Sequence, residues 1–182
     1  MFRCLLIFIF LISTSITQAS DREKIIENLQ KIKNLKFKFE QNINGKIENG
    51  YCTIQYPKKI FCDYLQSNQK TLVSNGKSLV IKTKSSFYRY PLNKTPLNLI
   101  LDKKFLIKKI NNSDEKIIDN SYINYRIIEN DNEINVFFDN KTYNLIGWQT
   151  KDIYQNINIT YLFSIQVNQE IDKNLFKLPS QN

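Results

Sequence analysis

Side chains that could do chemistry are few in this chain, because its 182 residues include no histidine. That absence removes the commonest general base, the commonest metal ligand, and every Ser–His or Cys–His nucleophile pair. The four glycines form neither a P-loop nor a dinucleotide-binding pattern. Paired carboxylates could still hydrolyse a glycosidic bond, but residues such as Asp114, Asp131 and Asp139 fall in predicted turns or on outer faces. We therefore expect no catalytic residue, metal or cofactor, with a carboxylate-dependent hydrolase as the enzymatic alternative.

Two cysteines, Cys52 and Cys62, flank a predicted turn at Tyr56–Lys59 and fall on the same apolar face of a hairpin. Exported proteins rarely keep free thiol pairs, so the pattern favours a disulfide. Two small buried thiols are the alternative. A three-residue loop is expected to place the two residues diagonally, so that a bridge requires a register shift or a bulge.

The cysteines belong to a segment, Gly50–Ile81, that predicts four short antiparallel strands. Apolar and polar residues alternate on both sides of the first turn, where Pro57 fixes φ and cannot donate a ladder hydrogen bond. Asn75-Gly76 predicts a second hairpin with a type I′ turn, in which both residues have positive φ. The segment is therefore expected to form a sheet with one apolar face.

The rest of the chain predicts helices and further antiparallel strands. A 3.6-residue period predicts an amphipathic helix over Asp21–Lys33. A second helix is expected to begin with Thr95 as N-cap and Pro96 at the first helical position. Phe105–Ile110 fits either a helical turn or a strand. The longest predicted strand, Ile157–Val167, has apolar residues at its odd positions, which we assign to the apolar face of the sheet.

The first residues predict a secretory signal peptide, residues 1–19. Arg3 is the charged start, Cys4–Ile12 the apolar region, and Thr17-Gln18-Ala19 the small-residue cleavage site. The apolar run is shorter than the roughly 20 residues of a transmembrane helix. We expect residues 20–182 to form a single domain outside the cytoplasm. The net charge is +9, but the basic residues are scattered, so we expect no nucleic-acid partner.

One question remains open at this point. Two short amphipathic helices hardly cover the apolar face of so broad a sheet. Either they leave a hydrophobic cavity beneath them, or they pack down and fill the core.

Several segments between residues 25 and 105 carry an ordered set of family motifs. They are Ile25–Ile32, Phe37-x-Phe39-x-Gln41, Gly50, Tyr56–Lys59 followed by Asp63-Tyr64, Leu72–Leu79, and Thr95–Leu101. In this order the set resembles the LolA family of periplasmic outer-membrane lipoprotein carriers. The second half of the chain is similar to the family in strand pattern alone.

The resemblance implies a mostly β fold with α-helices: an incomplete, half-open antiparallel β-barrel covered by a helical lid. It implies a monomeric periplasmic carrier that binds the acyl chains of lipoproteins in a hydrophobic cavity. Such a carrier takes its cargo from an inner-membrane lipoprotein-releasing ABC transporter and passes it to an outer-membrane lipoprotein acceptor. A lipoprotein- or lipid-sensing binding module with the same half-barrel fold is the alternative function.

On this basis we assign site residues, with ordinary core packing as the alternative for each. The expected lipid-binding residues lie on the predicted strands: Phe37, Phe39, Ile54, Ile60, Tyr64, Val73, Leu79 and Ile81. The expected lid residues lie on the predicted helices: Leu29, Ile32, Leu97, Ile100 and Leu101.

One departure from the family concerns the closing contact. Some members carry an arginine immediately before the turn proline, which reaches carbonyl groups of the lid helices. This chain has Tyr56 there, and a phenol offers one donor where a guanidinium offers five. We therefore name Tyr56 as the latch, weaker than the arginine, with Arg89 or a lysine as possible replacements.

Overall fold

The structure is a computed structural model that describes residues 19–65, 68–118, 121–129, 132–151 and 155–181. The predicted signal peptide, residues 1–19, lies outside this description apart from Ala19. Its helical elements are α1 (Asp21–Lys31), η1 (Leu92–Lys94), α2 (Leu97–Ile100) and α3 (Lys103–Asn111). Its first six strands are β1 (Asn34–Ile43), β2 (Lys46–Gln55), β3 (Lys59–Tyr64), β4 (Thr71–Asn75), β5 (Ser78–Lys82) and β6 (Phe87–Pro91). The others are β7 (Glu115–Ile118), β8 (Tyr122–Glu129), β9 (Asn132–Asp139), β10 (Leu145–Lys151) and β11 (Ile157–Val167).

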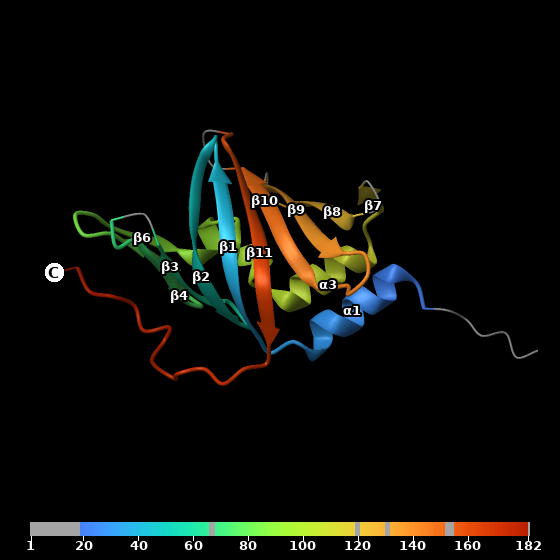
Figure 1. The fold of residues 1–182 in the computed structure, drawn as a ribbon, viewed down its shortest axis with the longest axis horizontal. Coiled ribbons are helices and arrows are strands. Elements are labelled where there is room, and N and C mark those ends of the chain that lie inside the picture. Colours follow the sequence, from blue (N-terminus) through green and yellow to red (C-terminus); the bar gives the residue numbers. More distant parts are fainter. Residues whose placement is uncertain (1–18, 66–67, 119–120, 130–131, 152–154, 182) are drawn as a thin grey trace, which may run out of the picture.

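The eleven strands form one antiparallel sheet in the order β6-β5-β4-β3-β2-β1-β11-β10-β9-β8-β7. The sheet is open, because β6 and β7 end this order and do not pair with each other. It curls strongly, and the helices lie against its concave side (Figure 1). The fold is thus mostly β and half-open, as predicted.

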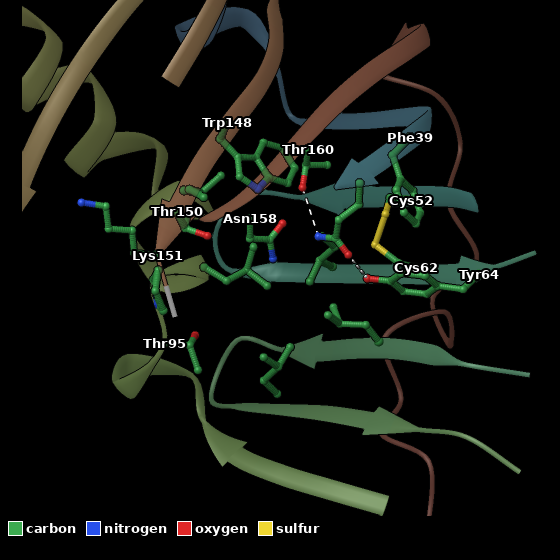
Figure 2. Close-up of a pocket in the computed structure, with 17 residues that line it drawn as sticks. Phe39, Cys52, Cys62, Tyr64, Thr95, Trp148, Thr150, Lys151, Asn158 and Thr160 are labelled. Carbon is green, nitrogen blue, oxygen red and sulfur yellow. Dashed lines mark hydrogen bonds between the residues drawn. A yellow bond between two sulfur atoms is a disulfide. The ribbon is translucent and has the colours of Figure 1, made fainter. Parts of the chain in front are cut away.

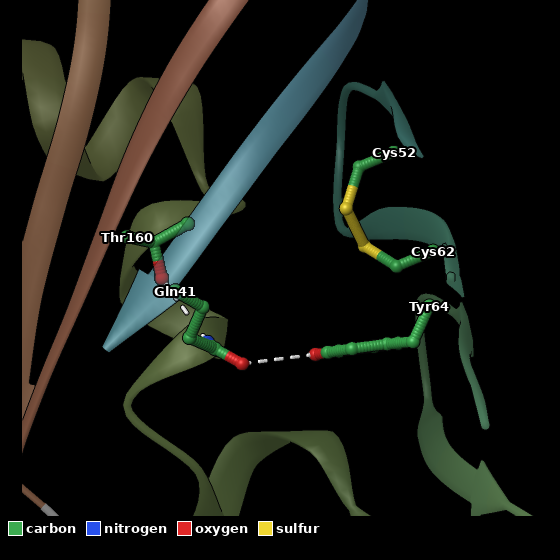
Figure 3. The surroundings of a disulfide bond; sticks show 5 residues. All are labelled: Gln41, Cys52, Cys62, Tyr64 and Thr160. Atoms are coloured by element: carbon green, nitrogen blue, oxygen red, sulfur yellow. Dashed lines mark hydrogen bonds between the residues drawn. A yellow bond between two sulfur atoms is a disulfide. The ribbon is translucent and has the colours of Figure 1, made fainter. Parts of the chain in front are cut away.

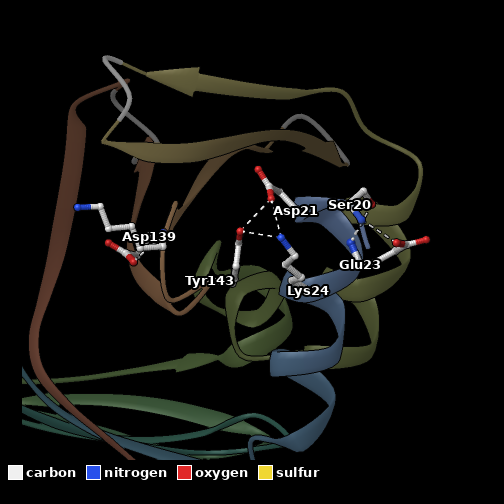
Figure 4. A network of polar contacts seen from close by, with 7 residues as sticks. Ser20, Asp21, Glu23, Lys24, Asp139 and Tyr143 are labelled. Atoms are coloured by element: carbon white, nitrogen blue, oxygen red, sulfur yellow. Dashed lines mark hydrogen bonds and ion pairs between the residues drawn. The ribbon is translucent and has the colours of Figure 1, made fainter. Parts of the chain in front are cut away.

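Helix α1 begins at a capping box that fixes its first turn. The Glu23 main-chain nitrogen donates to Ser20 Oγ at 3.3 Å, and the Ser20 nitrogen donates to Glu23 Oε2 at 2.8 Å. Lys24 Nζ donates to Tyr143 Oη at 3.0 Å, and the Tyr143 hydroxyl donates to Asp21 Oδ1 at 2.9 Å (Figure 4). This network anchors the helix to the β9–β10 turn, and the hydrogen bond to Tyr143 raises the pKa of Lys24.

Helices α1 and α3 fill the concave side over the second half of the sheet. Ile25 and Leu29 of α1 and Leu106 of α3 are at most 1% exposed, and they share one core cluster with Tyr125 and Phe138. In this half of the molecule the helices pack down on the sheet, which was the filled-core alternative.

Some sequence predictions of helix and turn boundaries are wrong. Helix α2 begins at Leu97 with Pro96 as its N-cap, while the Thr95 hydroxyl donates to the Leu92 carbonyl. At the second hairpin Gly76 has a φ of +96° but Asn75 does not have positive φ, so the turn is not type I′. Asn75 instead accepts hydrogen bonds from two following main-chain nitrogens through its side chain.

The longest strand presents its faces opposite to the expectation. The odd-numbered Tyr161 and Phe163 of β11 are 40% and 51% exposed, whereas Thr160 and Leu162 are buried. Gly147 of β10 pairs with Tyr161. Without a side chain there, the rings of Phe137 and Tyr161 stack at a centroid distance of 6.2 Å on the outer face. The apolar odd positions of this strand therefore belong to the convex surface and not to the core.

Candidate functional site

A cavity of about 220 Å³ lies between the concave face of the sheet and α2 (Figure 2). Strands β1 to β5 and β10 to β11 form its floor and sides. The lining residues are Phe39, Gln41, Cys52, Ile60, Cys62, Tyr64, Leu72, Leu79, Thr95, Pro96, Leu97, Ile100, Trp148, Thr150, Lys151, Asn158 and Thr160. The cavity therefore lies in the half of the molecule that α1 and α3 do not fill.

A disulfide between Cys52 and Cys62 forms part of the cavity wall (Figure 3). The two residues are direct cross-strand partners in β2 and β3, with Cα atoms 4.1 Å apart. The predicted diagonal placement is wrong. The three-residue loop pairs Gln55 with Lys59, and this register brings the cysteines opposite each other without a bulge. The bridge replaces two thiols by an apolar wall that spans two strands.

A chain of hydrogen bonds crosses the cavity floor from β3 to β11. The Tyr64 hydroxyl donates to Gln41 Oε1 at 3.1 Å, and Gln41 Nε2 donates to Thr160 Oγ1 at 3.1 Å (Figure 3). These partners satisfy polar groups that would otherwise be costly to bury. Burial raises the pKa of the Tyr64 phenol, and the nearby charge of Glu48 raises it further, so this phenol stays protonated and remains a donor.

A buried ion pair lies next to the same tyrosine. Glu48 of β2 is 3% exposed, and Lys70 Nζ lies 2.5 Å from its Oε2. Lys46 Nζ lies 2.9 Å from the other carboxylate oxygen. The Lys70 ammonium is also 4.0 Å from the centroid of the Tyr64 ring. This cluster closes the β2–β4 end of the concave face with charged groups.

The β10–β11 end of the cavity is polar. Thr150, Lys151 and Asn158 line it together (Figure 2). Asn158 Oδ1 is buried and has no hydrogen-bond partner among the described residues. The Lys151 side chain is 35% exposed and lies 3.4 Å from Glu133. The cavity thus has an apolar part over β2 to β5 and a polar part over β10 and β11.

The structure brings half of the predicted lipid-binding residues to the cavity: Phe39, Ile60, Tyr64 and Leu79. Phe37 and Ile54 are buried in the core cluster and do not line the cavity. Ile81 shares the concave face, because it pairs with Leu72, but lies beyond the cavity.

The assignment of Val73 to the lining is wrong. Val73 pairs with Phe61 and Val80, and all three point to the convex face. The segment after β11 runs back along this side of the sheet (Figure 1), where Phe176 is buried and its ring centroid lies 5.8 Å from Lys59 Nζ. Val73 is therefore a core residue on the side that the C-terminal segment covers.

Two of the five predicted lid residues, Leu97 and Ile100 of α2, line the cavity. Leu29 and Ile32 pack in the core near α1 and are 1% and 4% exposed. Leu101 is fully buried at the end of α2 without lining the cavity.

The Tyr56 latch expected from the resemblance is wrong. The Tyr56 hydroxyl is buried with no hydrogen-bond partner in the described part of the chain, and burial raises its pKa. The contact between the β2–β3 turn and the helices comes instead from Lys58. Its main-chain nitrogen donates to the Leu101 carbonyl at 2.9 Å, and its Nζ lies 3.3 Å from Asp102. Arg89 donates to Ser78 on the convex face and takes no part.

A second lysine joins the helices to one another. Lys103 Nζ donates to the carbonyl oxygens of Ile32 at 2.7 Å and Gln30 at 3.1 Å. It also lies 5.7 Å from the centroid of the Tyr56 ring. Burial lowers the pKa of Lys103. Sequence reasoning missed this contact, because the spacing of lysines does not indicate which carbonyl groups they reach.

Sequence reasoning also missed the polar lining residues Gln41, Asn158 and Thr160. In β11 the available signal was the even-numbered positions, which carry Asn158, Thr160 and Leu162 between apolar neighbours.

The described residues contain no group of three or more His, Cys, Asp or Glu side chains that could bind a metal ion. Among the helices of the described segments, none has the length and apolar content needed to cross a bilayer.

Comparison with known proteins relates the chain to one family and several folds. The family model described as outer membrane lipoprotein carrier protein LolA matches residues 30–179. A search of curated proteins finds no match.

Three solved structures illustrate the similarity of fold. LolA superfamily protein NE2245 from Nitrosomonas europaea is 8% identical, with 87% of this chain and 99% of that chain covered and a TM-score of 0.44. LprF from Mycobacterium bovis is 10% identical, with 84% and 96% covered and a TM-score of 0.44. MucB in the MucA/MucB complex of Pseudomonas aeruginosa is 8% identical, with 88% and 62% covered and a TM-score of 0.46.

Proposed function

Because the chain belongs to the LolA family of outer membrane lipoprotein carrier proteins, we propose that it binds the acyl chains of lipoproteins in the cavity beneath α2 and shuttles them across the periplasm. Proteins of this family are extracytoplasmic carrier or binding proteins rather than enzymes. In the proposed role the chain works as a monomer. It receives cargo from the inner-membrane lipoprotein-releasing ABC transporter and delivers it to an outer-membrane acceptor. Residues 1–19 serve as the export signal.

The cavity is the observation that carries this proposal. Leu72, Leu79, Leu97 and Ile100 face one another across it, and the disulfide adds a further apolar surface. Each methylene group that leaves water for such a surface gains about 0.8 kcal/mol. The site therefore favours a hydrocarbon chain, and it contains no histidine or metal cluster of the described residues that would suit catalysis.

The polar end of the cavity suits the other part of the cargo. An acyl chain in a lipoprotein is joined through an ester or amide, which offers acceptors and, for an amide, one donor. Asn158 Oδ1 has no partner among the residues described and can accept a hydrogen bond from an amide N–H. Lys151 and Thr150 can donate to carbonyl oxygens at the same end.

Release of the cargo requires α2 to move away from the sheet. This helix has four residues, and Lys58 connects its end to the β2–β3 turn by one main-chain hydrogen bond and one partly exposed ion pair. Such pairs contribute about 0–1 kcal/mol. We propose that α2 is the movable part of the lid and that α1 and α3 stay packed on the sheet.

The test uses inner-membrane vesicles that contain the transporter and a radiolabelled triacylated lipoprotein. The mature protein is expected to release lipoprotein into the soluble fraction in an ATP-dependent manner. Leu97→Glu places a carboxylate in the cavity wall and should reduce release at least tenfold. The matched control Leu65→Glu changes an exposed leucine, 61% accessible, and should release like the parent.

No soluble lipoprotein with the parent protein would contradict the carrier role. Binding of purified lipoprotein without release from vesicles would instead favour the sensing module.

A further inference from the structure

The cavity is too small for a complete acyl chain. A protein cavity of about 150 Å³ accommodates one benzene, which has six carbons. At the same ratio the 220 Å³ here hold about nine carbons. Long-chain acyl groups of about 16 carbons would therefore extend beyond the cavity by roughly seven. The rest of the chain requires an apolar surface that is continuous with the cavity wall.

Strands β5 and β6 provide such a surface on the concave side. Tyr90 of β6 is the direct cross-strand partner of Leu79, which lines the cavity. Tyr88 is the partner of Ile81, and Ile81 in turn pairs with Leu72 of the cavity wall. Cross-strand partners share one face of a sheet, with Cβ atoms about 5 Å apart. Ile81, Tyr88 and Tyr90 therefore extend the apolar wall from the cavity to the edge of the sheet, and we call them the β6 shelf.

The β6 shelf is open to solvent. Tyr88 is 52% exposed and Tyr90 is 43% exposed, although both are large aromatic side chains on the helix side of the sheet. From Leu72 to Tyr88 the wall crosses two strand spacings, or about 10 Å. Strand β6 ends where η1 begins, so the shelf lies next to the segment that carries α2.

We propose that the β6 shelf binds the distal part of a long acyl chain whose first half lies in the cavity. The polar end at Asn158 and Lys151, the apolar cavity wall at Leu72 and Leu79, and the shelf follow one another across the sheet from β11 to β6. The ligand therefore lies with its ester or amide toward β10 and β11 and its methyl end over β6. The two phenol hydroxyls stay at the water boundary, where tyrosine is favourable because one end is apolar and the other polar.

The inference rests on the proposed function, and it predicts a dependence on chain length. Complete burial of one methylene raises affinity about fourfold, and one-sided cover on a shelf about twofold. Between 10 and 16 carbons the affinity should then rise about 100-fold. Chains of 8 carbons should bind without using the shelf.

The experiment measures the binding of N-acylglycines of 8, 10, 12, 14 and 16 carbons to the mature protein, below their critical micelle concentrations. The double variant Tyr88→Ala/Tyr90→Ala should bind the 8-carbon ligand like the parent and lose at least tenfold at 16 carbons. Tyr88→Phe/Tyr90→Phe should retain the increase, because the rings and not the hydroxyls contact the chain. The matched control Tyr51→Ala/Phe163→Ala removes two rings of similar exposure, 49% and 51%, from the convex face and should change nothing.

The outcomes separate the two proposals. If the parent affinity stops rising near nine carbons, or if the alanine double variant keeps the full increase, the shelf does not bind the chain and the cavity assignment stands. If the parent binds no N-acylglycine of any length, the proposed function fails together with the shelf. Should the alanine variant unfold, the parent and phenylalanine curves still decide, because the absence of a rise beyond nine carbons overturns the shelf.

Discussion

Lys58 donates a main-chain hydrogen bond of 2.9 Å to the carbonyl oxygen of Leu101. The donor lies in the turn between β2 and β3, and the acceptor is the last residue of the segment that covers the cavity. Lys58 has a φ of +65°, so its side chain leaves the turn in an unusual direction and reaches Asp102 at 3.3 Å. Both contacts cross from the sheet to the helices, and the sequence position that suggested a latch, Tyr56, makes neither.

Asp102 has two roles that substitutions can separate. It pairs with Lys58, and its Oδ1 accepts from the Phe105 nitrogen at 3.1 Å as the N-cap of α3. Asp102→Ala should lower the free energy of unfolding by about 1 kcal/mol. Asp102→Asn keeps a good cap and should lower it by about 0.5 kcal/mol or less. Urea denaturation measures both, and equal losses would show that the cap is not the larger contribution.

The same pair of variants tests the movable helix. In Asp102→Asn the amide hydrogen of Lys58 should exchange faster with deuterated solvent, because opening of α2 exposes it. The Phe39 amide in the centre of the sheet should exchange as in the parent. Unchanged exchange at Lys58 would argue against the ion pair as a closing contact.

The Cys52–Cys62 disulfide should stabilise the fold without being needed for its register. For a loop of about ten residues, the chain-entropy model gives a contribution of about 2.5 kcal/mol. Reduction should therefore lower the free energy of unfolding by that amount, measured by urea denaturation with and without dithiothreitol. Cys52→Ala/Cys62→Ala should be insensitive to dithiothreitol. A parent protein that is equally insensitive, with two free thiols by mass spectrometry, would contradict the bridge.

Gly50 is required by close packing rather than by its backbone conformation. A Cβ atom there would overlap the Asp63 carbonyl oxygen and lie 2.7 Å from the Phe39 ring. Because a main-chain atom cannot move aside at low cost, Gly50→Ala should destabilise the protein by about 1–3 kcal/mol. Asn49→Ala, on the outer face of the same strand, should cost about 0.5 kcal/mol or less. Equal thermal unfolding temperatures of the two variants would contradict this account.

Glu133 should make stability depend on acidic pH. Its hydrogen bond from Arg126 Nε, 2.7 Å long, holds its pKa below the ordinary 4.5, with a further contribution from Lys151. The native state therefore binds this proton less readily than the unfolded state, and stability from this site is present above pH 4.5. It is lost as the pH falls through the lower native pKa. The unfolding free energies of the parent and Glu133→Gln should differ at pH 7 and converge at low pH, and a difference independent of pH would contradict the assignment.

Local periodicity was sufficient for much of the fold. The alternation in Leu35–Phe39 and around the Tyr56–Lys59 turn predicted β1, β2 and β3 correctly, because each has one face buried against the core. In β11 the same rule fails. Its outer face carries aromatic residues that pack on one another and on neighbouring strands, while its inner face borders the polar end of the cavity.

The cavity itself depends on contacts between segments far apart in the chain. Gln41, Tyr64 and Thr160 come from three strands, and their hydrogen bonds follow from strand order and register rather than from any local motif. The closing contact likewise depends on the turn conformation at Lys58. Sequence patterns therefore located the apolar wall at Phe39, Ile60 and Leu79 but not the polar end or the latch.

The most direct test of the central claim is photo-cross-linking with a diacylated lipopeptide that carries a diazirine in one acyl chain. After irradiation and digestion, mass spectrometry identifies the labelled residues. The account predicts labels at Leu72, Leu79 and Leu97 when the diazirine is near the ester, and at Tyr88 or Tyr90 when it is near the methyl end. Labels confined to Tyr51, Phe163 and other residues of the convex face would contradict an acyl-binding cavity.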